Sequence, residues 1–473
     1  MYIDGPEADQ ESLKRRIADL ERRARHVPED ADAQFELGCA YLDGRAFASA
    51  AGAFERATAI HPTSPGAFFN LGYVYELMEQ WNKAHEALQR GLAIDQNDAY
   101  GHLHLGHVYT RQERYQEAGA AYLEAVALGG ESAEAYHGLG YIQLLQENYV
   151  RALDYLELAL ELDADSASLQ YDLGYTYSRL GENAQARKHL ERAIELEPTD
   201  AAPHFQLGCI CEEERQYAEA IEHFRWGLKL EDSDALAHTH LGYLYSLDGQ
   251  TERALEHLER AIACDGTDPD PYRYRADIHH ESGRLDRALA DYRTALDLDP
   301  QDAENYHALA LVLADAGRYP EALVALDDAL SVDPTMVRAY VDAGRVHLAL
   351  GEEAEALRSI RQATRFIPSE GEAGLLLSVV AVLEGDRETA VFEARRFVEA
   401  FRTTICTKPR GREEKAVWEM FHLLEDVGGL TPQVEGVDLL MLEVFEDLQT
   451  VMRDQPESTL NVAVRTKLEE LGR

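Results

Sequence analysis

A 34-residue pattern repeats without insertion or deletion from Ala31 to about Thr404. Its anchor is a small residue that returns once in each of eleven copies, at Gly38, Gly72, Gly106, Gly140, Gly174, Gly208, Gly242, Ala276, Ala310, Gly344 and Ser378. A fixed period of this length is typical of a solenoid of helical hairpins, in which each repeat contacts only its neighbours. Such a chain offers one long surface, and its function is expected to depend on the side chains along that surface.

Each repeat has the pattern of two amphipathic helices of about a dozen residues. Within Phe68–Asp95, Leu71 and Tyr75 recur at helical spacing, and Ala84 and Leu88 do so after a polar break. The pattern predicts that the first helix of each pair begins near residues 31, 65, 99, 133, 167, 201, 235, 269, 303, 337 and 371. Twelve residues after each anchor stands an alanine, at Ala50, Ala84, Ala118, Ala152, Ala186, Ala220, Ala254, Ala288, Ala322, Ala356 and Ala390. We expect both small residues at the closest approach of the two helices, where a larger side chain would force them apart.

Two segments carry the pattern most completely: "FELGCAYLDGRAFASAAGAFERATAIHP" (Phe35–Pro62) and "YDLGYTYSRLGENAQARKHLERAIELEP" (Tyr171–Pro198). Their order of aromatic, Leu-Gly, Tyr, then Ala, aromatic, Ala and Pro resembles the tetratricopeptide repeat. The resemblance covers roughly four fifths of the chain. It implies an all-α fold, a right-handed α-solenoid of helical hairpins. Known members are mostly scaffolds and peptide-binding adaptors, but the shared residues are core residues and name no partner.

The two ends depart from the repeat. Residues 1–30 are expected to form a tail and a helix over Asp9–His26, with the narrow apolar stripe Leu13, Ile17, Leu20 and Ala24. The simpler interpretation of this helix is a cap on the repeats at 31–404, because a solenoid needs a polar end. The alternative is a short coiled coil that forms a dimer. Residues 405–473 lack the repeat signature and are expected to form a C-terminal helical cap or, alternatively, a docking module, with helices at about 413–427, 437–453 and 457–471.

The net charge of −42 argues against nucleic acid and anionic membranes as partners. The carboxylates are expected mainly on a solvated outer face, and secondarily to attract a basic partner. There is no apolar run long enough to span a membrane and no signal peptide at the N-terminus. The cysteines are odd in number and favour a reducing, cytoplasmic location: Cys39, Cys209, Cys211, Cys264 and Cys406.

The resemblance implies that the first helix of each pair lines the concave surface. With the anchor as position 8, positions 2, 5, 6, 9, 12 and 13 point inward. Positions 5 and 9 hold aromatic residues and histidines in the first seven repeats and become charged later. The predicted partner is a protein or peptide, with a basic partner as one option. Its predicted contacts are Phe35, Phe69, Tyr73, His107, His137, Tyr141, Tyr171, Tyr175, Phe205, Tyr243, Arg273 and Arg345. Packing against the next repeat is the alternative role of the rings, and a self-assembling homo-oligomer is the alternative function.

An enzyme is not expected, because the chain lacks HExxH, GxxxxGK[ST] and GxSxG. We therefore predict a non-catalytic scaffold or adaptor without catalytic residues, cofactor or metal. The segments "HLHLGH" and "HTHLGY" leave one remote alternative. His104 and His107 have the spacing of zinc ligands on a helix, and His137 in the next repeat is expected beside His107. A histidine-based, metal-dependent activity therefore stays open.

Overall fold

The computed structural model describes residues 6–129 and 132–366, together with single positions between 374 and 396. These residues form helices, turns and loops, without a strand among them, which confirms the predicted all-α fold. The chain divides into two compact units, Met1–Asp232 and Ser233–Arg473, which are treated separately below. Most of the predicted eleventh repeat, and all of 405–473 with its expected helices, lie outside the described residues.

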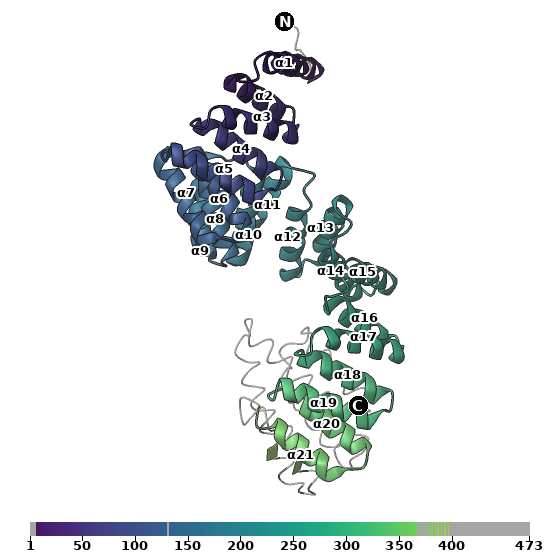
Figure 1. Cartoon of the computed structure of the whole chain (residues 1–473). Helices are drawn as coiled ribbons and strands as arrows, with labels where there is room; N and C mark the ends of the chain where they lie inside the picture. Colours follow the sequence, from purple (N-terminus) through teal and green to yellow (C-terminus); the bar gives the residue numbers. More distant parts are fainter. Residues whose placement is uncertain are drawn as a thin grey trace. The chain divides into compact units, whose positions relative to one another are not determined.

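The first unit begins with α1 (Pro6–His26) and continues as six helical hairpins (Figure 1). The hairpins are α2 (Ala31–Asp43) with α3 (Phe47–Ile60), α4 (Pro65–Leu77) with α5 (Trp81–Ile94), α6 (Ala99–Arg111) with α7 (Tyr115–Gly129), α8 (Ala133–Leu145) with α9 (Tyr149–Leu162), α10 (Ala167–Arg179) with α11 (Asn183–Leu196), and α12 (Ala202–Glu213) with α13 (Tyr217–Leu230). From α3 to α11, each second helix packs against the first helix of the next hairpin, and successive first helices from α4 to α12 also contact one another.

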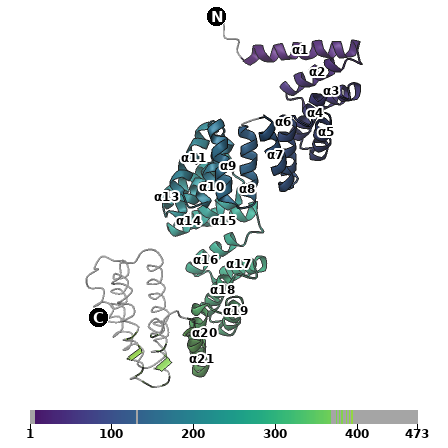
Figure 2. The same cartoon turned by 90° about the vertical axis from the view of Figure 1, so that its left-hand side faces the viewer.

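The second unit repeats the arrangement in four described hairpins (Figure 2). They are α14 (Ala235–Leu247) with α15 (Thr251–Cys264), α16 (Asp270–Glu281) with α17 (Leu285–Leu298), α18 (Ala303–Asp315) with α19 (Tyr319–Val332), and α20 (Val337–Ala349) with α21 (Glu353–Ala363). In both units the first helices begin within one residue of the predicted positions, so the 34-residue phase is confirmed over the described hairpins. Within the described part of the chain, every helix is too short or too polar to cross a membrane.

The anchor glycines lie where the two helices of a hairpin are closest, as predicted. A Cβ atom built on Gly174 would lie 2.6 Å from Leu190 Cγ and 3.2 Å from the Ala186 carbonyl oxygen on α11. Gly72 stands in the same relation to Leu88 and Ala84 on α5. These approaches bury the large side chains of the second helices completely and produce a thin core that runs from hairpin to hairpin.

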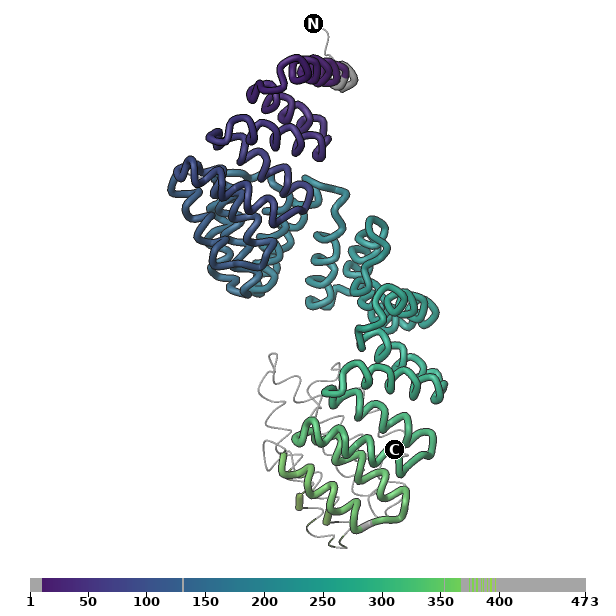
Figure 3. Tube along the Cα trace, viewed as in Figure 1, coloured from purple at the N-terminus to yellow at the C-terminus, as the bar shows by residue number. Residues whose placement is uncertain are grey.

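The two helices of each described hairpin are joined by a short turn (Figure 3). Each of these turns contains one residue with a positive φ angle, and these residues recur every 34 positions. Five are glycines, at Gly181, Gly249, Gly283, Gly317 and Gly351, and five are not, at Arg45, Glu79, Glu113, Glu147 and Arg215. In the α8–α9 turn, Glu147 has φ 58°, and the Asn148 N–H then donates back to the Gln143 carbonyl over 2.8 Å. This left-handed residue ends the first helix and sets the direction of the second.

Six of the ten described first helices begin at side-chain caps, which stand at equivalent positions of the 34-residue period. Asp98, for example, accepts a 2.8 Å hydrogen bond from the Gly101 N–H at the start of α6. Equivalent caps are formed by Asp30, Ser132, Ser166, Asp234 and Asp302. Because the cap satisfies an N–H that the helix itself leaves unpaired, each one fixes where a first helix begins.

Candidate functional site

Four consecutive first helices each carry a tyrosine on one face, and we call this set the tyrosine row: Tyr73 on α4, Tyr100 on α6, Tyr141 on α8 and Tyr175 on α10. Tyr100 occupies position 2 of its repeat and the other three occupy position 9. Seven residues are close to two helical turns, so these positions point to the same side. Tyr100 and Tyr141 are each 40% exposed, and Tyr73 and Tyr175 are half-buried.

The predicted contact residues fall into three groups by exposure. Tyr141 is exposed. The half-buried group consists of Phe35, Tyr73, His107, His137, Tyr171, Tyr175, Phe205, Tyr243, Arg273 and Arg345. Phe69 is only 3% exposed, because its ring packs against Gly91 on α5 and Gly101 on α6, where a side chain would collide with it. Phe69 is therefore a core residue, and the packing alternative holds at this position.

Phe205 and Tyr171 lie between these extremes, because each ring is partly buried. The Phe205 ring packs against Gly227 on α13, so part of its surface serves the hairpin rather than a partner. Burial raises the pKa of the Tyr171 hydroxyl to about 12, with Asp172 and Asp200 adding to the effect. Tyr171 is therefore a neutral hydroxyl at physiological pH, and the part of the ring that stays accessible is uncharged.

Carboxylates on the same side of the first helices form hydrogen bonds with histidines of neighbouring repeats. His137 Nε2 on α8 lies 2.7 Å from an Asp172 oxygen on α10, and in the second unit His307 on α18 lies 2.7 Å from Asp342 on α20. Both pairs are 35 residues apart, one repeat plus one residue. The sequence suggested His137 beside His107, and the hydrogen-bond partner of His137 is Asp172.

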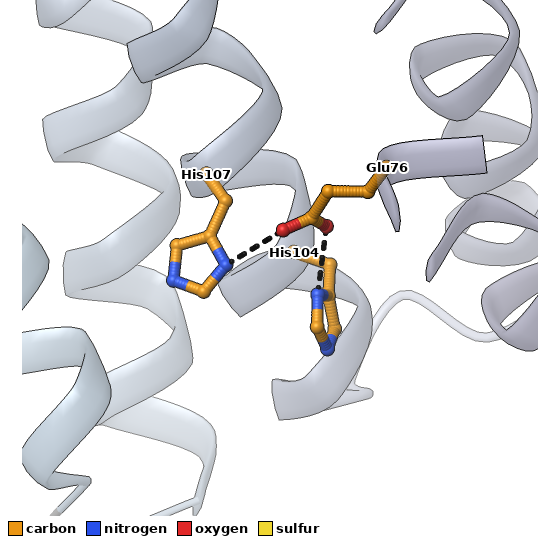
Figure 4. Close-up of side chains that lie close together, drawn as sticks. All are labelled: Glu76, His104 and His107. Carbon is orange, nitrogen blue, oxygen red and sulfur yellow. Dashed lines mark hydrogen bonds and ion pairs between the residues drawn. The ribbon is translucent and has the colours of Figure 1, made fainter. Parts of the chain in front are cut away.

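A cluster of three polar side chains joins α4 to α6 (Figure 4). His104 Nδ1 donates to Glu76 Oε2 over 2.9 Å, and His107 Nδ1 donates to Glu76 Oε1 over 3.1 Å. The exposed fractions of the three side chains are 16% for Glu76, 8% for His104 and 30% for His107. Burial by itself would raise the pKa of Glu76, but the two histidine hydrogen bonds outweigh it and hold this pKa at about 2.

Aromatic rings surround this cluster. The ring centroids of Tyr100 and Tyr73 lie 4.2 and 4.8 Å from that of His104, and the Tyr122 centroid lies 5.5 Å from that of His107. The cluster therefore adjoins the end of the tyrosine row that α4 and α6 contribute. It presents a carboxylate and two imidazoles in a mostly apolar surround.

The charged residues predicted as contacts in the second unit hold partners of their own. Arg273 donates to Asp270 over 3.0 Å and lies over the Tyr274 ring, 4.1 Å from its centroid. Arg345 donates to Asp342 over 2.8 Å. Each guanidinium already binds a carboxylate, so neither is a free anchor for an acidic group of a partner.

A second polar cluster, Cys211, Glu219 and His223, lies between α12 and α13, but an arginine from α11 enters it. Arg187 donates to Glu219 over 3.0 Å and to the Cys211 sulfur over 3.1 Å. Burial, the largest influence, raises the pKa of the Cys211 thiol to about 11. The site is thus an ion-paired junction between hairpins with a protonated thiol.

Sequence reasoning missed Glu76, Tyr100 and Asp172. They stand at positions 12, 2 and 6, which belong to the predicted inward set, but only positions 5 and 9 were compared between repeats. The available signal was their membership of the inward set in adjacent repeats: Glu76 precedes His104 and His107 by 28 and 31 positions.

Two family models described as "Tetratricopeptide repeat" match residues 41–105, 143–206 and 313–378, and residues 15–65, 105–167 and 205–269. A third, described as "TPR repeat", matches residues 276–316. The matched segments together span residues 15–269 and 276–378. None of the curated proteins matches the chain.

Several solved structures resemble parts of the chain. YrrB, described as a TPR protein with an unusual peptide-binding site, is 28% identical over 38% of this chain and 94% of its own, with a TM-score of 0.34. MamA is 26% identical over 34% of this chain and 95% of its own, with a TM-score of 0.32. PilF of Pseudomonas aeruginosa is 18% identical over 45% of this chain and 97% of its own, with a TM-score of 0.42.

Proposed function

The chain belongs to the tetratricopeptide repeat family, and from that premise we propose that it is a non-catalytic scaffold that binds a protein or peptide along the tyrosine row. The observation that carries the proposal is the exposure of this row. Tyr100 and Tyr141 leave 40% of their surface open, on helices whose other large apolar side chains are mostly buried in the core. Tyrosine offers a large apolar contact with little loss of rotamer entropy, and it is enriched in binding surfaces.

The length of the row indicates the length of the bound segment. Packed helices lie about 8–10 Å apart, so the row crosses on the order of 30 Å over four first helices. An extended chain covers this distance with roughly nine residues at about 3.3 Å each. A helical segment would need about 20 residues, at 1.5 Å each.

The charges near the row indicate the chemistry of the partner. Glu76 is held by His104 and His107, and Asp172 is held by His137, so these carboxylates already have hydrogen-bond partners within the chain. The row itself is therefore suited to apolar and aromatic side chains. The net charge of −42 acts at longer range and favours a segment whose flanking residues are basic.

A pull-down with matched variants tests the proposal. Intact wild-type chain, a Tyr141→Ala/Tyr175→Ala double variant and a control are immobilised, and captured proteins are quantified by mass spectrometry. The control carries Val150→Ala and Leu158→Ala on the second helix α9, where these side chains are 68% and 42% exposed. We expect one or more proteins to be captured by wild type and control and to be depleted at least tenfold by the double variant, a difference of about 1.4 kcal/mol.

Size-exclusion chromatography with light scattering runs in parallel on the three proteins. If wild type and the double variant have equal masses, the two substitutions leave self-association unchanged, and the loss of captured protein is a loss of partner binding. If the wild type were an oligomer that only the double variant dissociates, the occupant of the row would be a second copy of the chain. Equal capture by all three proteins would contradict the proposal that a partner binds along the tyrosine row.

A further inference from the structure

The cluster of Glu76, His104 and His107 has the composition of a three-ligand metal site. Two imidazoles and one carboxylate form a donor set that zinc uses in proteins with one position left for water or another ligand. His104 and His107 are three residues apart on α6, which brings both rings to one side of the helix, and Glu76 reaches them from α4. One donor atom from each residue lies within 4.8 Å of the other two.

The distances within the cluster are close to those of a tetrahedral zinc site. Zinc bonds of about 2.0–2.1 Å to oxygen and nitrogen place neighbouring donors roughly 3.4 Å apart. Glu76 oxygens lie 2.9 Å from His104 Nδ1 and 3.1 Å from His107 Nδ1, somewhat nearer than that spacing (Figure 4). An ion would replace the two hydrogen bonds after small rotations of the three side chains.

The surroundings favour a cation. No lysine or arginine among the described residues forms an ion pair with Glu76. The Tyr73, Tyr100 and Tyr122 rings limit solvent around the histidines, which strengthens the attraction between the carboxylate and an ion. His107 is 30% exposed and leaves an approach from the outside.

We propose that Glu76, His104 and His107 bind one Zn²⁺ ion that links the first helices of two neighbouring hairpins. The three protein ligands leave a coordination position on the side of the half-exposed His107. The ion adds a cross-link between α4 and α6, so its binding stabilises the folded state by mass action. The site requires no bound partner and is independent of the scaffold function proposed above.

The second cluster provides an internal comparison. Cys211, Glu219 and His223 also lie within 4.8 Å of one another. Arg187, however, donates to both Glu219 and the Cys211 sulfur, and its positive charge occupies the place that a cation would take. The second cluster therefore contains an arginine side chain that the first cluster lacks, and only the first is expected to bind metal.

The test uses the full-length chain after treatment with a chelator. Zn²⁺ alone is titrated and followed by calorimetry, and Co²⁺ alone is titrated and followed by its visible absorption. The variants are Glu76→Gln and His107→Gln, with His223→Gln as the matched control from the second cluster. We expect one equivalent of Zn²⁺ per wild-type chain, a tetrahedral Co²⁺ spectrum, and the same behaviour in His223→Gln. Glu76→Gln and His107→Gln should bind at least tenfold more weakly.

Thermal unfolding separates a metal site from a purely structural hydrogen-bond cluster. A structural cluster would make Glu76→Gln and His107→Gln less stable to the same extent with and without Zn²⁺. A metal site requires that Zn²⁺ raises the unfolding midpoint of wild type and His223→Gln, and raises it less in the other two variants. Absence of saturable Zn²⁺ binding in the wild type, or binding that Glu76→Gln and His107→Gln leave unchanged, would overturn the proposal.

Discussion

The Tyr41 hydroxyl on α2 donates a 2.7 Å hydrogen bond to Glu21 on α1, twenty residues earlier in the chain. Tyr177 on α10 makes the same contact with Glu157 on α9, over 2.8 Å and the same separation. In the second case the acceptor belongs to the second helix of the preceding hairpin. The helix α1 therefore contacts α2 as the second helix of a hairpin contacts the first helix of the next one, in agreement with a family match that begins at residue 15.

This relationship predicts the effect of removing α1. Ala24 and its neighbours on α1 pack against Leu37 and Tyr41 on α2, and Ala53 on α3 belongs to the same cluster. Deletion of residues 1–26 would expose this apolar surface, so we expect faster amide hydrogen exchange in α2 and α3 and unchanged exchange in α8–α11. Unchanged protection of α2 and α3 would mean that α1 does not cap the solenoid.

The anchor glycines predict opposite results for two equal substitutions. Gly174→Leu inserts a side chain where even a Cβ atom meets Leu190 and the Ala186 carbonyl, and it should cost about 3 kcal/mol through overpacking. Gly119 on α7 has no atom within 4 Å of a Cβ position, so Gly119→Leu should be neutral or stabilising. Chemical unfolding of both variants measures the difference. Equal losses would show that interhelical space does not determine the outcome.

The turns predict a stabilising substitution. Glu147 has φ 58°, a conformation that costs a residue with a side chain roughly 1–2 kcal/mol relative to glycine. Gly181 fills the equivalent turn of the next hairpin with φ 78° and no atom near a Cβ position. Glu147→Gly should therefore raise the unfolding midpoint and Gly181→Glu should lower it. A shift in the same direction for both variants would contradict the role assigned to these turns.

Most of the fold could be predicted from the sequence, because each hairpin repeats the same local pattern. The anchor residues predicted the helix starts within one residue, and periodic caps such as Asp98 mark the same starts. The site was less predictable. Whether Phe69 is core or surface depends on Gly91 and Gly101, which lie on two other helices and make room for its ring. The residue type at position 5 alone therefore does not show whether its side chain is buried.

The same limit applies to the polar contacts. His107 and His137 were expected to be neighbours because they occupy inward positions in consecutive repeats. The actual partners are Glu76 and Asp172, which lie in the repeat before His107 and the repeat after His137. Which inward positions meet is decided by the offset between successive first helices, and that offset follows from side-chain packing rather than from the period.

A buried histidine, His189, predicts one component of the pH dependence of folding stability. Burial, assisted by the charge of Lys188, lowers the pKa of His189 below 6.5, and its Nδ1 lies 2.8 Å from the side-chain oxygen Oε1 of Gln170. The unfolded chain then binds a proton more readily than the folded chain. The stability that this neutral ring contributes is complete above pH 6.5 and is lost as the pH falls below that value.

We therefore expect wild type to lose more stability between pH 7.5 and 5.5 than His189→Gln does. The measurement is the unfolding midpoint of each protein across this range. The exposed His61, replaced in the same way, provides the control and should follow the wild type. An equal or steeper loss in His189→Gln would contradict the assignment of a neutral ring.

The most direct test of the central claim is hydroxyl-radical footprinting of the intact chain with and without a captured partner, because it reports on side chains. Tyr141 lies on the first helix α8 and is 40% exposed, whereas Trp226 lies on the second helix α13 and is 49% exposed. Partner binding along the tyrosine row should reduce oxidation of Tyr141 and Tyr175 several-fold and leave Trp226 unchanged. Protection of Trp226 with full oxidation of Tyr141 and Tyr175 would contradict the account.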